Sequence, residues 1–171
     1  MSLAQAEEEK PRGVTQHASM DSMLFDRTFD EGMSLVEETA RYLDGRGREE
    51  SRVLPRKAAL LYAGESMRVT TRLMQAASWL LIQRAVREGE MRAEDAAGER
   101  YRLGSKDICL GGRSEGIEHL PATLRDLLDR SEHLYQRIAR LEKAMLGESP
   151  QIRPVVQVQF ERLQQNFGEA V

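Results

Sequence analysis

Apolar residues recur along this chain at steps of three and four, the period of an α-helix, in three long segments. The first helix is expected to begin between Ser19 and Thr28, because Thr28-Phe-Asp-Glu31 has the spacing of a capping box. Glycine often ends a helix in the left-handed conformation, so Gly45-Arg-Gly47 marks its end, with a loop through Ser51. One stripe of this helix is apolar: Phe25, Phe29, Met33, Val36, Ala40 and Leu43.

The second helix is the longest and the most informative. Pro55 fits its first turn and Gly89 its end. It is apolar on more faces than a surface helix needs, so we expect it to be covered by packing partners within the fold or in a second chain. One seam consists of Ala63, Met67, Thr70, Met74, Ala77 and Leu81, and the other of Val69, Leu73, Ala76 and Leu80. Glu65, Arg68, Arg72 and Gln75 form a narrow polar strip with Trp79 in its middle.

The third helix carries a heptad seam and ends at Gly147. A short turn over Met91–Ala97 and a glycine-rich loop over 98–118 precede it, and the loop has room for a small hairpin. Such a loop is too long for a simple connector, and both a partner site and a mobile crossover fit it. The heptad seam consists of Leu120, Leu124, Leu127, Ser131, Leu134, Ile138, Leu141 and Met145.

These elements predict an all-α protein whose single domain, residues 19–147, is a three-helix bundle. Residues 1–18 mix charges, proline and glycine without a period, which is typical of a disordered arm. Residues 148–171 contain Pro150 and Pro154 followed by an alternating apolar segment, and we expect a flexible tail there.

Charge and cysteine content narrow the class of protein. With 28 acidic and 25 basic residues, the net charge of -3 gives no electrostatic case for binding nucleic acid. Cys109 is the only cysteine, and Glu7-Glu-Glu9 stands where a secretory signal would be basic and then apolar, so a cytoplasmic location is expected. The longest apolar cluster, Ala76 to Ile82, is too short for membrane insertion.

No catalytic, cofactor or metal site is predicted. Gly64-Glu-Ser-Met-Arg68 resembles the start of a nucleophile elbow, but the helix continues straight through it. Glu115 and His119 have the i,i+4 spacing of a metal-ligand pair but lie partly in the glycine-rich loop, and Cys109 has no partner that would lower its pKa. A basic cluster at Arg46–Lys57, interrupted by Glu49 and Glu50, keeps a helical DNA-associated regulatory protein as the alternative function.

Two features are candidates for binding partners. An indole in a polar strip is costly to leave in water, so Trp79 is expected to contact a second chain or the loop after Gly98, where Tyr101 lies, and simple burial beneath that loop fits equally well. The tail is the second candidate, as a peptide that a partner binds or as a disordered end. Its apolar residues are Val155, Val156, Val158, Phe160 and Leu163.

Three stretches together resemble the bacterial RcdA family, the regulators of CtrA degradation. They are Phe29–Leu43, Tyr62–Val86 and Glu88–Met91, and the resemblance extends roughly from Phe25 to Met145. The string from Glu65 to Ala85 is its most specific part.

The resemblance implies a homodimer of three-helix bundles that acts without catalysis. Such a protein would be an adaptor that promotes degradation of CtrA and other cargo by the ClpXP protease during the cell cycle. CpdR and PopA would be its accessory partners, and it would be recruited to a cell pole. The family implies no catalytic residues.

Overall fold

The computed structural model describes residues 12–147, with side chains from Ser22 onward. Within this range every regular element is a helix, which confirms the all-α expectation for the part described. The long helices are α1 (Arg12–Asp44), α3 (Arg56–Arg87) and α6 (Ala122–Met145). The short helices are α2 (Arg46–Arg52), α4 (Ala93–Ala96) and α5 (Lys106–Cys109), with 3-10 turns η1 (Glu99–Tyr101) and η2 (Ile117–His119).

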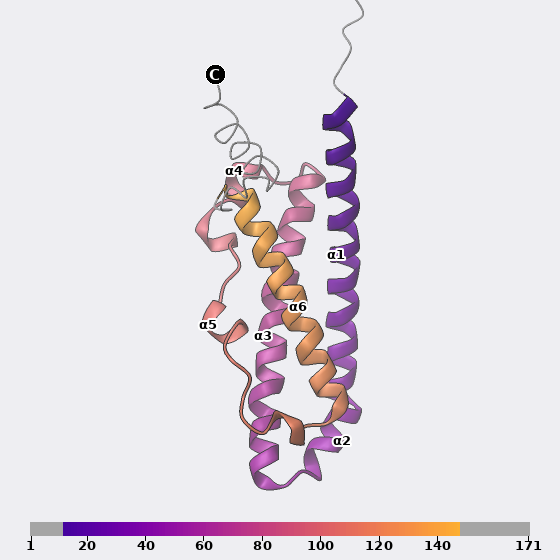
Figure 1. Ribbon diagram of the computed structural model, residues 1–171, viewed down its shortest axis with the longest axis vertical. Coiled ribbons are helices and arrows are strands. Elements are labelled where there is room, and N and C mark those ends of the chain that lie inside the picture. The colour runs from indigo at the N-terminus through magenta and orange to yellow at the C-terminus, as the bar shows by residue number, and fades with distance from the viewer. Residues whose placement is uncertain (1–11, 148–171) are drawn as a thin grey trace, which may run out of the picture.

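The three long helices pack side by side, and α3 contacts both of the others (Figure 1). α1 and α3 run in opposite directions because α2 turns the chain between them, whereas α3 and α6 run in the same direction (Figure 1). The chain must therefore return along the whole length of α3 before α6 begins. Residues 98–118, here called the crossover segment, make this return.

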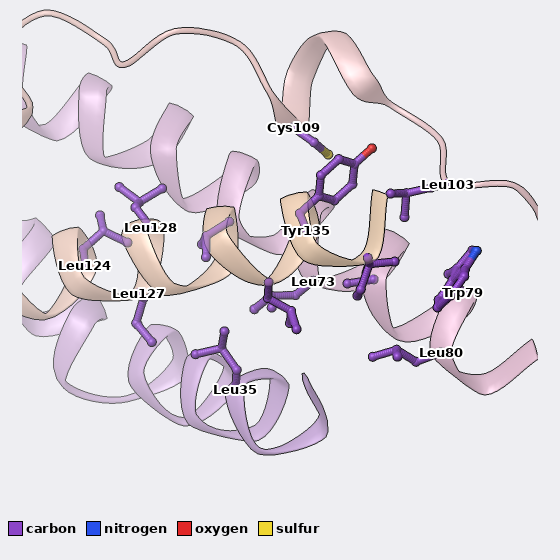
Figure 2. Close-up of a cluster of buried hydrophobic side chains, with 14 of the residues drawn as sticks. Leu35, Leu73, Trp79, Leu80, Leu103, Cys109, Leu124, Leu127, Leu128 and Tyr135 are labelled. Atoms are coloured by element: carbon purple, nitrogen blue, oxygen red, sulfur yellow. The ribbon is translucent and has the colours of Figure 1, made fainter. Parts of the chain in front are cut away.

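The core lies where α1, α3 and α6 meet (Figure 2). Leu35 of α1, Leu80 of α3 and Leu134 of α6 are fully buried there. Gly32 lets α1 approach closely, since a Cβ at this position would lie 2.7 Å from Cδ1 of Leu80. The heptad seam of α6 is confirmed from Leu124 to Ile138, all of whose members are buried; Leu120 is also buried but precedes α6, Leu141 is half-buried and Met145 at the end is exposed.

The predicted start of the first helix is wrong, and so is the loop after it, whereas its end at Asp44, directly before Gly45, is as predicted. α1 begins at Arg12, inside the stretch predicted as a disordered arm, because the sequence from residue 12 to 44 contains no proline to stop it. Thr28 does not cap the helix; its hydroxyl donates to the carbonyl of Leu24 within the same helix. The predicted loop through Ser51 is helix α2.

Gly47 serves close packing and not a left-handed cap. It is buried within α2, and a Cβ there would lie 2.6 Å from Oη of Tyr62 and 2.8 Å from the carbonyl oxygen of Tyr42. α1 does end directly before Gly45, but Gly45 has a negative φ, so the predicted left-handed cap is wrong. The predicted ends of α3 are correct: Pro55 precedes its first residue, and Gly89 has a φ of +75° beyond its last.

Sequence periodicity does not show which faces of α3 lie inward. The polar strip faces inward, with Glu65, Arg72 and Trp79 buried beneath the crossover segment. The seam that begins with Ala63 and Met67 faces outward. The crossover segment contains α5 and the two 3-10 turns and no strand, so the small hairpin is also wrong.

Candidate partner-binding surfaces

The crossover segment is fixed to the bundle by buried charged side chains. Arg72 is only 3% exposed, and its Nε donates to the carbonyl of Cys109 at 2.7 Å. Its Nη1 donates to the carbonyl of Leu128 at 3.2 Å, so the guanidinium joins the crossover segment to α6. Burial lowers the pKa of Arg72, but an arginine keeps its proton in proteins, and Glu132 lies 3.8 Å away.

Further along the crossover segment, α3 and α6 bind its backbone in the same way. The amide of Leu103 donates to the buried carboxylate of Glu142, and the amide of Gly104 donates to Gln75. Burial raises the pKa of Tyr135, whose hydroxyl donates to the carbonyl of Gly104 at 2.6 Å. Because the helices bind main-chain atoms, the outward side chains of the crossover segment are not needed to hold it in place.

Trp79 is buried within the single chain. Its side chain, 4% exposed, lines a pocket of about 140 Å³ together with Tyr101, Ala96 of α4 and Met145 of α6. This arrangement matches the interpretation in which Trp79 is buried beneath the loop. Tyr101 is half-buried beside it, and the ring of Tyr101 is covered by the Arg100 guanidinium at 4.5 Å. A partner role for Trp79 and Tyr101 stays a prediction.

The outward face of α3 carries a row of large apolar side chains seven residues apart. Leu60, Met67, Met74 and Leu81 are 77%, 73%, 64% and 52% exposed. Smaller residues fill the strip beside this row, and no charged residue interrupts it. We call this surface the α3 seam: Leu60, Ala63, Gly64, Met67, Thr70, Thr71, Met74, Ala77, Ser78 and Leu81. Beside it, a groove of about 310 Å³ separates α3 from Val36, Ala40 and Leu43 of α1.

The residues with possible chemistry are dispersed. Among residues 12–147, no three His, Cys, Asp or Glu residues come together as metal ligands. Cys109 is fully buried, and burial raises the pKa of its thiol. In the basic cluster, Nε of Arg46 donates to Glu50 at 2.8 Å, so part of that positive charge is paired within the cluster. A search of the described helices finds none suited to crossing a membrane.

Comparison with known proteins decides the family. The family described as "Protein of unknown function (DUF1465)" matches residues 16–167. The chain belongs to this family. Among solved structures, RcdA from Caulobacter crescentus CB15 is 60% identical, with 74% of this chain and 95% of that chain covered and a TM-score of 0.62. The resemblance to RcdA is therefore confirmed. No curated protein matches the chain.

The DUF1465 match also reaches the tail. It extends to residue 167, so it includes Val155, Val156, Val158, Phe160 and Leu163, although the sequence resemblance stopped at Met145. These five residues lie outside the described part of the structure, and their partner role stays a prediction. The α3 seam lies within the matched region, and sequence periodicity identified six of its ten residues without indicating which way they face: Ala63, Met67, Thr70, Met74, Ala77 and Leu81.

Proposed function

We propose that this protein is a non-enzymatic adaptor that promotes degradation of CtrA and related cargo by the ClpXP protease, together with CpdR and PopA, at a cell pole. The 60% identity to RcdA carries the proposal, since this is the role that the RcdA resemblance implies. An adaptor needs no reaction of its own, because holding cargo beside the protease raises the local concentration of cargo and lets weak contacts change its degradation rate.

Reconstituted proteolysis tests this function. Purified ClpXP, CpdR, PopA and CtrA are combined with the full chain, and CtrA loss is followed with time. We expect the full chain to accelerate the loss, and the absence of any acceleration would contradict the proposal. A chain ending at residue 149 should keep its helical circular dichroism but deliver cargo more slowly, since the tail is the second predicted partner site. Full activity of the shortened chain would exclude the tail.

We also propose that two such three-helix bundles form a homodimer through the α3 seam. An apolar surface of this length is unusual on a monomer and is typical of an interface. The order of its residues supports a second copy as the partner, because the pattern reads the same from either end about a point between Thr70 and Thr71. The matched pairs are Leu60 with Leu81, Ala63 with Ser78, Gly64 with Ala77, and Met67 with Met74.

Such a pattern is what a two-fold axis requires of an antiparallel helix pair. In an interface of this kind the same patch is used on both chains, so each residue meets its counterpart from the other half of the seam. The large side chains of one α3 would lie against the small strip and the groove beside Ala40 on the partner. Thr70 and Thr71 fit the centre, because each hydroxyl already donates to a carbonyl of its own helix and leaves a methyl group outward.

Light scattering and crosslinking test the dimer. The wild-type chain should have twice its 19.4 kDa mass, and Met74→Lys should be monomeric because a lysine would be buried at the axis. Ile108→Lys, which changes an exposed apolar residue away from the seam, should stay dimeric. A mixture of Met67→Cys and Met74→Cys chains should crosslink more than either alone. A dimeric Met74→Lys protein would refute this interface.

A further inference from the structure

A second groove, of about 840 Å³, lies between the first half of α3 and the end of the crossover segment. It is at the end of the molecule where α2 lies, the lower end in Figure 1. Its α3 wall is mainly apolar, with Ala58, Leu60 and Leu61, and Gly64 and Gly116 leave room for a chain to lie close to the backbone. Its size suits a peptide segment or a small molecule.

The floor of this groove contains a buried carboxylate. The Glu65 side chain is 4% exposed, and its Oε1 accepts the hydroxyl of Ser114 at 2.5 Å and lies 3.6 Å from Nη2 of Arg68. Oε2 makes no hydrogen bond with any residue that the structure describes. It is also absent from the fully enclosed polar atoms that lack a partner, so Oε2 keeps some exposure, and Glu65 is one of the residues that line the groove.

The charge around the groove is slightly negative. Glu115 and Glu118, both exposed, and the buried Glu65 carry three negative charges, against two positive charges on Lys57 and Arg68 when His119 is counted as neutral. The guanidinium of Arg68 donates to the carbonyls of Gly111 and Gly112, at 3.3 and 2.8 Å, so it is already engaged with the crossover segment. A partly buried carboxylate gains more from a hydrogen-bonded cation than an exposed one does, because solvent screens it less.

We propose that this groove, the α3–η2 groove, binds a short segment of a partner protein in which a basic side chain donates to Oε2 of Glu65. The aliphatic neighbours of that side chain lie on Leu61 and Ala58, which do not belong to the α3 seam. The partner is thus recognised by a lysine or arginine flanked by aliphatic residues. This proposal rests on the adaptor function and adds a binding site for one partner. Its test needs no protease, so the adaptor function and the groove can fail separately.

Fluorescence anisotropy with two labelled peptides tests the site on the purified full chain. One probe is fluorescein-Ala-Leu-Arg-Leu-Ala-amide, and the other has citrulline, the neutral shape equivalent, in place of arginine. We expect the arginine probe to bind about tenfold more tightly, the range of one charge-assisted hydrogen bond. Equal affinities, or no binding of the arginine probe at millimolar concentration, would overturn the proposal.

Variants locate the binding. Glu65→Gln keeps the shape and the bond to Ser114 but should remove the preference for arginine, whereas Glu94→Gln on the distant helix α4 should keep it. Ala58→Trp fills the groove without touching Glu65 and should abolish binding of both probes at an unchanged melting temperature. This variant decides the question if Glu65→Gln does not fold.

Three further results would overturn the proposal. One is a preference for arginine that persists in Glu65→Gln, and another is binding by Ala58→Trp at the wild-type affinity. The third is tighter probe binding by a chain ending at residue 149, because this would make the chain's own tail the occupant of the groove and not a partner.

Discussion

Replacing Arg72 with methionine tests whether buried charge holds the crossover segment. Methionine keeps most of the aliphatic volume but cannot donate to the carbonyls of Cys109 and Leu128. The Leu128 carbonyl keeps a donor in the hydroxyl of Ser131, whereas the Cys109 carbonyl loses the side chain that binds it. An unsatisfied buried acceptor costs about 1–3 kcal/mol, and removing a buried cation returns part of its desolvation cost. We expect a net loss of about 2 kcal/mol in the free energy of unfolding.

Urea denaturation measures this loss, and hydrogen exchange locates it. Amide exchange should accelerate over residues 104–113, where the crossover segment is released, and much less in the core of α6. Arg92→Met is the matched control, since Arg92 is exposed and, among residues 22–147, pairs only with neighbouring Asp95, and it should leave both measurements unchanged. If Arg72→Met were as stable as wild type, with unchanged exchange over 104–113, then Arg72 would not be what holds this segment.

Three further predictions follow from packing and charge. Trp79→Ala should lower the unfolding free energy by about 3–5 kcal/mol because the indole is buried, and an unchanged melting temperature in circular dichroism would contradict this. Gly47→Ala should cost about 1–3 kcal/mol by forcing a Cβ against Tyr62, as differential scanning calorimetry would show, and a stabilised variant would contradict the packing. Hydrogen bonding from Arg130 lowers the pKa of Glu38, so their ion pair stabilises the fold above the ordinary pKa of 4.5 and loses this contribution as pH falls through the lowered value. The stability difference between wild type and Glu38→Gln should therefore be small at pH 7, because both side chains are about 40% exposed, and should vanish in acid; a difference that grows in acid would be the wrong sign.

The positions of the long helices follow from the sequence, but the orientation of α3 does not. Hydrophobic periodicity gave the extent of α3 and α6, because proline and glycine mark their ends and the spacing of leucines needs no tertiary information. The orientation of α3 could not be predicted, because a polar strip ordinarily faces water. Here Arg72 and Glu65 face inward because the main chain of the crossover segment needs hydrogen-bond partners there.

Predictions from short local motifs were also wrong where the residues of the motif contact another part of the fold. The predicted capping box at Thr28 does not form, because α1 extends through this position. The hydroxyl of Thr28 instead donates to the carbonyl of Leu24 in the preceding turn. The glycines after Asp44 do follow the end of α1, but Gly45 is not left-handed, and Gly47 is explained by its contact with Tyr42 and Tyr62, which lie on two other helices. A contact of this kind depends on residues distant in the chain, so no local pattern could show it.

The inward side of α3 supports the fold and the outward side is the proposed dimer interface, so mutations can separate folding from dimerisation. The inward side binds the crossover segment through main-chain atoms, so changes to outward residues of that segment, such as Ile108, leave those bonds intact. The outward side has no partner among the described residues, so a charge at Met74 leaves the core of a single chain undisturbed. Loss of dimerisation without loss of fold should therefore come from the α3 seam. Loss of fold should come from Arg72 and its neighbours beneath the crossover segment, because there one helix face supports both the core and the return of the chain.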